Sequence, residues 1–160
     1  MHSLPIYFEH IKKYYPQASF DPTKIMQIEI VLGTFTLDIR ELQLSNEPSE
    51  VLNLQYFLPL TFLAPDYTLQ ITHLQLCNLI NMYLPYGAVG IDYKNMLFYW
   101  KYSETITKEM NIAMSAQKNK MLLDFTSTLL SVSHYSFNAI IKEGFSLEEG
   151  LKDSNWESLL

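Results

Sequence analysis

The side chains best suited to metal or nucleophilic chemistry are few and far apart in this chain of 160 residues. The histidines, His2, His10, His73 and His134, include no pair at the i, i+4 spacing with which a helix presents two metal ligands. Cys77 is the single cysteine and lies among apolar residues, with no base or cation close in sequence. The sequence therefore predicts structural or surface histidines and a buried thiol, with no metal site and no catalytic nucleophile.

Gly87 and Gly90 form a G-x-x-G pattern that could be mistaken for a phosphate-binding loop. The pattern follows a helix-like segment and precedes a strand-like one, the reverse of the order that places a phosphate at a helix N-terminus. The sequence contains neither a Walker motif nor a G-x-S-x-G motif. A structural turn is the better interpretation, and we expect no catalytic residue and no cofactor.

The charge of the chain limits the classes of partner that it is expected to bind. The formal net charge is −6, and the 11 basic residues are scattered and include one arginine, Arg40. A basic surface for nucleic acid or an anionic membrane is therefore not expected. Residues 51–91 carry a single formal charge, Asp66, but prolines and amides interrupt this run too often for membrane insertion. With one cysteine and no signal-peptide pattern, the sequence predicts a cytoplasmic protein.

The first third of the chain is patterned as a helix and a β-hairpin. Ser3 is a plausible N-cap, and Pro16 is expected to close the helix. Alternating apolar and polar residues then predict strands at residues 27–30 and 34–40, joined by a tight turn at Leu32-Gly33, with one face of the second strand exposed to water.

A third strand over residues 52–62 is the longest run of alternation. Its even-numbered residues, from Leu52 to Phe62, are expected to share one face. Because Pro59 lacks an amide donor, we expect this strand at a sheet edge or with a bulge.

The helical pattern of residues 71–83 predicts a second helix that is buried on most sides. Pro85 ends this helix, and Gly87 supplies an unrestricted backbone position. Gly90 would let another backbone pack closely. A second hairpin follows, with strands at residues 88–92 and 96–102.

The rest of the chain predicts one long helix, or a short helix joined to a long one near residues 115–119. Thr105 or Thr107 can cap it, and Gly144 ends it. Ser146 and Glu149 fit a capping box for a last short helix. We interpret the apolar stripe of the long helix as Met110, Met114, Met121, Leu122, Phe125, Leu129, Val132 and Phe137.

These elements predict an α+β fold: helix, three-stranded antiparallel meander, helix, β-hairpin and long C-terminal helix. We expect a single domain over residues 1–144 and a short, amphipathic, acidic tail over residues 145–160.

The stretch from Leu74 to Lys101 combines a helix rich in leucine and asparagine, a Leu-Pro-Tyr-Gly turn, a short strand ending in Asp and an alternating strand. This stretch resembles the class I secretion chaperones and the YbjN-type sensory regulators. The order of elements resembles the type III secretion chaperone-like fold. The residues of the motif are Leu84, Pro85, Tyr86, Gly87, Gly90 and Asp92.

The resemblance implies a non-enzymatic homodimer that holds an extended segment of a client protein, such as a secreted effector. No catalytic motif of these families is available to carry over, and the tail after Gly144 has no counterpart in them. A partner could contact apolar residues of the third strand, the methionine-bearing helix and the tail, although packing in the core or in a dimer is the alternative. These residues are Tyr56, Phe57, Leu58, Leu60, Met110, Met114, Trp156 and Leu159.

Two other functions fit the composition. The aromatic residues could line a cavity of an enzyme or a small-ligand sensor, built from Tyr83, Tyr86, Tyr99, Trp100 and His73. A small acidic chain could also neutralise a toxin as an immunity protein.

Overall fold

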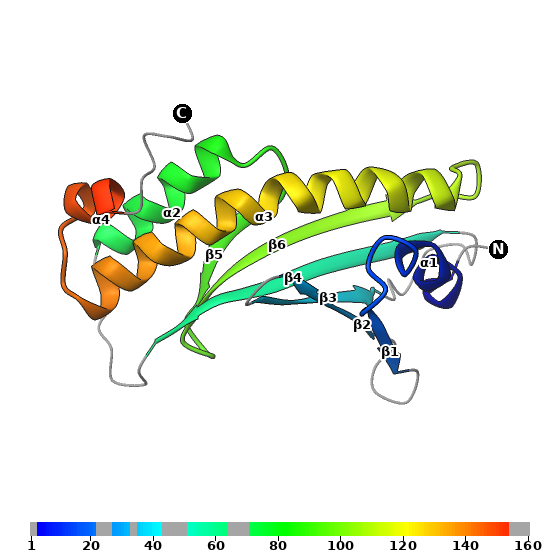
Figure 1. Cartoon of the computed structure of the whole chain (residues 1–160), viewed down its shortest axis with the longest axis horizontal. Coiled ribbons are helices and arrows are strands. Elements are labelled where there is room, and N and C mark those ends of the chain that lie inside the picture. The colour runs from blue at the N-terminus through cyan, green and yellow to red at the C-terminus, as the bar shows by residue number, and fades with distance from the viewer. Residues whose placement is uncertain (1–2, 22–26, 33–34, 43–50, 64–70, 154–160) are drawn as a thin grey trace. The chain divides into compact units, whose positions relative to one another are not determined.

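The computed structural model describes residues 3–21, 27–32, 35–42, 51–63 and 71–153 (Figure 1). The chain divides into two compact units. Unit 1 comprises Met1–Leu58 and Lys101–Asp124, and unit 2 comprises Pro59–Trp100 and Phe125–Leu160. Each unit is described by itself.

The order of elements confirms the predicted α+β class. Six strands form a sheet in the order β1-β2-β3-β4-β6-β5. The elements are α1 (Leu4–Ile11), β1 (Ser19–Asp21), β2 (Gln27–Leu32), β3 (Phe35–Glu41), β4 (Leu52–Phe62), α2 (Ile71–Tyr83), β5 (Ala88–Asp92), β6 (Leu97–Ile106), α3 (Ile112–Lys142) and α4 (Leu147–Asp153). The division into one domain and a tail stays a prediction.

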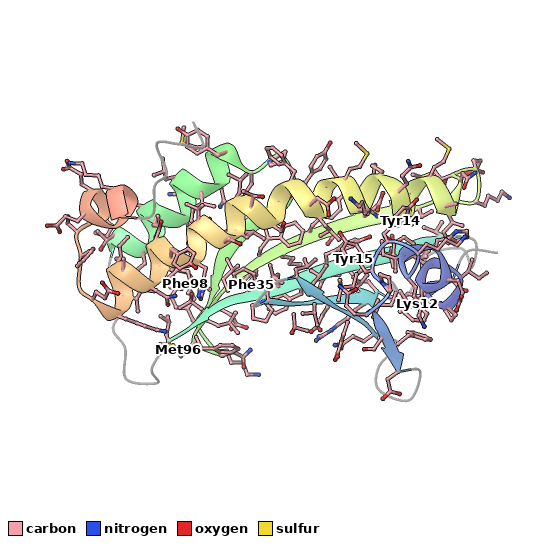
Figure 2. The ribbon with its side chains drawn as sticks, in the orientation of Figure 1. Lys12, Tyr14, Tyr15, Phe35, Met96 and Phe98 are labelled. Atoms are coloured by element: carbon pink, nitrogen blue, oxygen red, sulfur yellow. The ribbon has the colours of Figure 1, made fainter. Side chains whose placement is uncertain are left out.

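The N-terminal helix is shorter than the sequence predicted. It ends at Ile11, and a turn leads on to Tyr15, which is buried although it lies outside the helix. The Lys12 ammonium lies 5.1 Å from the ring centroid of Phe8, so its alkyl chain covers this end of α1 (Figure 2). Ser3 occupies the N-cap position without a side-chain hydrogen bond, and Pro5 in the first turn has no N–H that would need an acceptor.

The meander in unit 1 has a strand that the sequence analysis missed. β1 pairs antiparallel with β2, from Ser19 opposite Glu29 to Asp21 opposite Gln27. β2 pairs with β3 over its whole length, which confirms the predicted hairpin. A strand of three residues is too short to show a period, which is why alternation did not reveal β1.

β4 lies between β3 and β6 in the sheet order, so the prediction of an edge strand is wrong. Pro59 is tolerated because the register with β3 runs from Leu54 to Phe57 and Pro59 lies beyond it. The alternation also shifts near the end of the strand: Thr61 is buried, whereas Phe62 is 67% exposed.

The connection between α2 and β5 in unit 2 is a tight turn. Gly87 has a φ of 71°, a left-handed conformation that favours glycine, as the sequence predicted. A Cβ on Gly90 would lie 2.9 Å from the Tyr99 hydroxyl, so this glycine accommodates a side chain and not another backbone. At the next turn, Asp92 accepts hydrogen bonds from the Lys94 and Asn95 amides and closes the second hairpin.

α3 is a single helix of 31 residues. It begins later than predicted, because β6 continues to Ile106. Asn111, and not a threonine, is its cap, and its Oδ1 accepts from the amides of Ala113 and Met114 at 2.9 and 3.3 Å. Gly144, with a φ of 74°, follows the helix as predicted.

The predicted apolar stripe of α3 is wrong in its first half. Met114, Met121 and Phe125 are exposed, whereas Leu129 and Phe137 of the same stripe are buried. The buried face repeats every three or four residues and mixes apolar with polar side chains: Ala116, Asn119, Leu123, Thr126, Leu130, Ser133, Phe137 and Ile140. Ser133 can be buried because its hydroxyl donates to the Leu129 carbonyl at 2.7 Å.

The last described helix, α4, begins with the predicted capping box. The Ser146 amide donates to Glu149 Oε2 at 2.9 Å, and the Glu149 amide donates to the Ser146 hydroxyl at 3.3 Å. Gly150 faces α3 closely: a Cβ there would lie 2.6 Å from Ile140 Cγ1. Trp156 and Leu159, two of the predicted partner-binding residues, lie outside the described residues.

Candidate functional site

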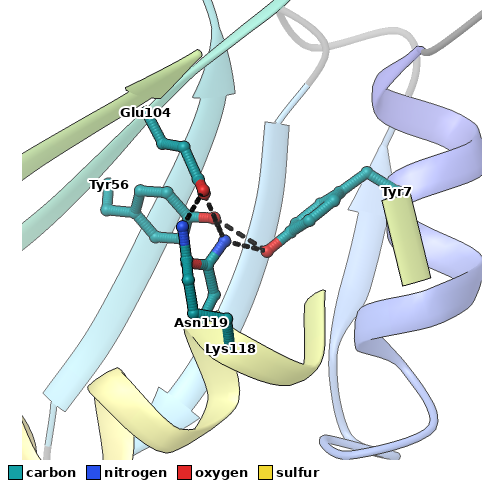
Figure 3. Close-up of polar contacts among 5 residues, drawn as sticks. All are labelled: Tyr7, Tyr56, Glu104, Lys118 and Asn119. Atoms are coloured by element: carbon teal, nitrogen blue, oxygen red, sulfur yellow. Dashed lines mark hydrogen bonds and ion pairs between the residues drawn. The ribbon is translucent and has the colours of Figure 1, made fainter. Parts of the chain in front are cut away.

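A buried polar cluster in unit 1 joins side chains of four elements (Figure 3). The hydroxyls of Tyr7 on α1 and Tyr56 on β4 lie 2.7 Å apart. The Nδ2 of Asn119 on α3 lies 3.0 Å from the first hydroxyl, 2.7 Å from the second and 2.5 Å from Oε2 of Glu104 on β6. The other oxygen of Glu104 pairs with the ammonium of Lys118, which reaches the surface.

The protonation and pairing of these side chains suit a structural link between the helices and strands of unit 1. Burial raises the pKa of Tyr7 and of Tyr56, so both phenols stay protonated at neutral pH and exchange hydrogen bonds without acting as bases. The Glu104 carboxylate is buried and is compensated by an ammonium and an amide. The cluster therefore ties α1 and α3 to the strands of unit 1.

Asn119 is the centre of the cluster. Its amide nitrogen has two hydrogens for three acceptors, so the bond between the two tyrosine hydroxyls is needed to satisfy the third. Its Oδ1 is buried and has no hydrogen-bond partner in the described structure. Asn119 thus contacts three of the other four members of the cluster directly.

The predicted contact residues of β4 belong to the core. Tyr56, Leu58 and Leu60 are buried, and Phe57, on the other face of the strand, is half-buried. In unit 1, Tyr56 is covered by Tyr7 and Asn119, which explains why its large apolar surface does not face water. Contact of these residues with a partner stays a prediction.

The methionines of the long helix are on the surface. Met114 and Met121 are 67% and 65% exposed, and Met110, in the turn before α3, is partly exposed. The two helix residues lie seven positions apart and hence on one face, which we call the Met face. Exposed unbranched side chains of this kind can adapt to differently shaped partners.

A second apolar surface lies on α2 in unit 2. Ile71 and Met82 are 74% and 77% exposed, and the helix contains no Asp, Glu, Lys or Arg. The sequence prediction that α2 is buried on most sides is therefore wrong; its buried residues are His73, Leu76, Cys77 and Ile80. We call the exposed residues the α2 face: Ile71, Leu74, Gln75, Asn78 and Met82.

The aromatic residues proposed for a ligand cavity do not converge on one. His73 and Trp100 are buried, and the Trp100 indole donates to the Tyr86 carbonyl at 3.1 Å. The rings of His73 and Phe98 pack edge to face with centroids 6.0 Å apart. Tyr83 and the Tyr86 side chain are exposed. These aromatic residues thus fill the core of unit 2 or face the solvent.

His134 links α3 to β4 in unit 2. Its Nδ1 lies 2.7 Å from the Leu60 carbonyl, which only accepts, so this nitrogen carries the proton. Its Nε2 then accepts from the Asn138 amide at 2.9 Å. Partial burial lowers the pKa of His134, and Lys142 lowers it further. The imidazole is therefore neutral at neutral pH and serves as a bridge between the two elements.

The remaining candidates for reactive chemistry are inert or absent in the described part of the chain. Burial raises the pKa of the Cys77 thiol to about 12, so it is not a thiolate at neutral pH. Among the described residues, no three His, Cys, Asp or Glu side chains are grouped so that they could hold a metal ion. No described helix is long and apolar enough to cross a membrane.

The sequence analysis missed the residues that organise both units: Glu104 and Asn119 in unit 1, and Asn81 and His134 in unit 2. A signal was present for Asn119. It lies three residues after Ala116 and four before Leu123, the spacing of a helix face that is otherwise small or apolar. A polar residue at such a position needs a buried partner, but the sequence does not say which residue that partner is.

The comparisons with known proteins give one match. No family model and no curated protein matches the chain. A search of solved structures finds a chain in the structure of the HopA1–SchA chaperone–effector complex, with 15% sequence identity and a TM-score of 0.44. The match covers 79% of this chain and 92% of that chain. At this level of similarity the match carries no argument, and the proposals below rest on residues of this chain.

Proposed function

We propose that this protein is a non-enzymatic chaperone or adaptor of the cytoplasm, which acts as a homodimer and holds an extended segment of a client protein. The observation that carries the proposal is the exposure of large apolar side chains on two helices, at the Met face of unit 1 and the α2 face of unit 2. The resemblance of Leu74 to Lys101 to secretion chaperones points to the same class of function.

The α2 face suits a second copy of the chain. In a two-fold dimer the same patch meets itself, so any formal charge on it would face a like charge. The chain has a net charge of −6, yet α2 has no formally charged residue over its 13 positions. Two copies of this helix can therefore pack Ile71, Leu74 and Met82 together without charge repulsion.

The Met face suits the client segment. Methionine side chains can repack around several apolar sequences, which a protein holding an extended segment requires. Lys118 and Lys120 lie between Met114 and Met121 on the same stretch of α3, each paired with an acidic residue of this chain. A segment with apolar and acidic residues would match both kinds of side chain.

The dimer is tested by the mass in solution, measured by light scattering after size exclusion. We expect twice the 18.7 kDa of one chain. Met82→Glu should give one chain, since it places like charges across the two-fold axis. Tyr93→Glu is the matched control, because Tyr93 is exposed and apolar but lies on the turn after β5, and it should stay dimeric. A monomeric wild type, or a dimeric Met82→Glu, would contradict this part of the proposal.

The client is tested by affinity capture followed by titration with a synthetic segment of the captured protein. We expect one dominant protein whose disordered segment binds the purified wild type. The double variant Met114→Asp/Met121→Asp should lose this binding, and Tyr93→Asp should keep it. Binding that is the same in all three proteins, or no protein captured under several conditions, would count against a client at the Met face.

A further inference from the structure

The amide of Asn81 occupies a strand-pairing position on β5. Asn81 lies near the end of α2, and its Nδ2 donates to the Val89 carbonyl at 3.0 Å. Its Oδ1 accepts from the Val89 amide at 2.7 Å. Both bonds lie within unit 2, and both engage the backbone of Val89, the second of the five residues of β5.

β5 is the last strand in the sheet order, so one of its two edges does not face another strand of the sheet. In an antiparallel ladder, the N–H and C=O of a given residue point to the same neighbouring strand. The Asn81 side chain uses one of its two N–H donors and its carbonyl oxygen here, the same donor and acceptor groups that a peptide supplies. The pair of bonds from Asn81 to Val89 therefore has the pattern that a strand added beside β5 would form.

The surroundings keep Asn81 in this position. α2 packs beside β5 (Figure 1), and the chain between them is the tight turn that contains Gly87. Val89 itself is buried, with its side chain in the core, so its backbone cannot rotate away from the edge. A side chain fixed on a helix thus occupies the hydrogen-bonding groups of the edge at Val89.

We propose that Asn81 seals the edge of β5, so that this edge accepts no further strand, and that its removal creates a strand-acceptor site. Open edges pair with other chains unless something blunts them. The occupant of the unsealed site would be the β5 edge of a second copy, since identical antiparallel edges are complementary. This inference is independent of the client and of the α2 face.

The test is amide hydrogen exchange at Val89, followed by NMR at low and high protein concentration. In Asn81→Ala the Val89 amide should exchange at least about tenfold faster than in the wild type at low concentration. At high concentration it should become protected again, together with the appearance of a species larger than any formed by the wild type. Tyr93→Ala is the control at an exposed residue of the same unit that lies outside the α2 face, and it should change neither quantity.

Two outcomes would overturn the inference. If the Val89 amide exchanges at the wild-type rate in Asn81→Ala, the amide of Asn81 does not cover the edge. If exchange is faster but no concentration restores protection, Asn81 only fastens α2 to β5. Should Asn81→Ala fail to fold, Asn81→Asp keeps the acceptor for the Val89 amide and loses only the donor to its carbonyl, and the same two readouts apply with smaller changes.

Discussion

The two units attach the long helix to the sheet by different physical means. In unit 1, α3 inserts Asn119 among two hydroxyls and a carboxylate, and the contact consists of hydrogen bonds (Figure 3). In unit 2, α3 inserts the fully buried Phe137, whose ring lies 4.1 Å, centroid to centroid, from that of Phe98 on β6. The attachment in unit 1 is polar and directional, whereas the attachment in unit 2 combines this apolar contact with the single hydrogen bond from His134 to the Leu60 carbonyl.

The two kinds of contact contribute differently: the hydrogen bonds fix the position of the helix, whereas the apolar contact supplies free energy of folding. Hydrogen bonds add little net stability because water satisfied the same groups in the unfolded chain, but they accept few geometries and are costly to leave unmade. Apolar burial contributes more free energy and tolerates more arrangements. We infer that the polar cluster sets the register of α1 and α3 on the strands of unit 1, whereas the aromatic contact supplies stability to unit 2.

The largest effect should come from Phe137→Ala. Removing a buried aromatic ring leaves a cavity and costs about 3–5 kcal/mol. Chemical denaturation should show this loss of the free energy of unfolding, and hydrogen exchange should place it in unit 2. Phe125→Ala, at an exposed position of the same helix, is the control and should cost less than about 0.5 kcal/mol. Equal losses in the two variants would mean that the aromatic contact is not what stabilises unit 2.

Asn119→Ala should have the next largest effect, a loss of about 1–3 kcal/mol, because it leaves buried hydroxyls and a carboxylate without their donor. Whether the cluster acts as a unit is tested by the coupling between two substitutions. In a Tyr7→Phe background, where one of these acceptors is already gone, the same substitution should cost less, and the double-mutant cycle should give an interaction energy of at least about 0.5 kcal/mol. Additive losses would show that the cluster does not act as a unit.

Gly87→Ala should cost about 1 kcal/mol, since a Cβ disfavours the left-handed conformation that Gly87 adopts. This effect concerns the backbone of one residue in the turn before β5, whereas the two substitutions above remove contacts between residues that are distant in sequence. Gly87→Asn should lose less, because asparagine tolerates this conformation better than alanine. Thermal melts of the three proteins check the order, and an unchanged melting temperature in Gly87→Ala would contradict the role of this glycine.

The smallest effect concerns pH and His134. Its pKa in the folded protein lies below the usual value of 6.5, so as the pH falls below 6.5 the unfolded chain takes up a proton before the folded one does. This residue's contribution to stability is therefore present above pH 6.5 and decreases as the pH falls. The loss of unfolding free energy between about pH 7.5 and about pH 5.5 should be smaller in His134→Gln than in the wild type. An equal loss would mean that other groups cause it.

The apolar pattern located the elements of both units but misjudged which faces are buried. On α3 the pattern favoured methionines and Phe125, the most apolar residues, whereas the buried face contains Asn119, Thr126 and Ser133. A polar side chain can be buried when it has a hydrogen-bond partner. For the Ser133 hydroxyl this partner is the Leu129 carbonyl. The helix α2 was expected to be buried on most sides, but Ile71 and Met82 are largely exposed.

Local features were predicted best. The positive φ of Gly87 and Gly144 and the capping box of Ser146 and Glu149 depend on residues close in sequence, so residue type and spacing are sufficient to predict them. The three-residue strand β1 was missed because its partner β2 defines it, and no period can show in so short a stretch.

By itself, the sequence determined the α+β class, the turn before β5, the glycine after α3 and the capping box of α4, because these follow from periodicity and from the backbone preferences of glycine, proline and capping residues. Only the tertiary structure decided that Tyr7, Tyr56, Glu104 and Asn119 meet in one cluster, and that Asn81 pairs with the backbone of Val89. Hydrogen bonds between distant residues depend on where the whole chain places each group. That placement also decided which apolar side chains remain on the surface for a partner.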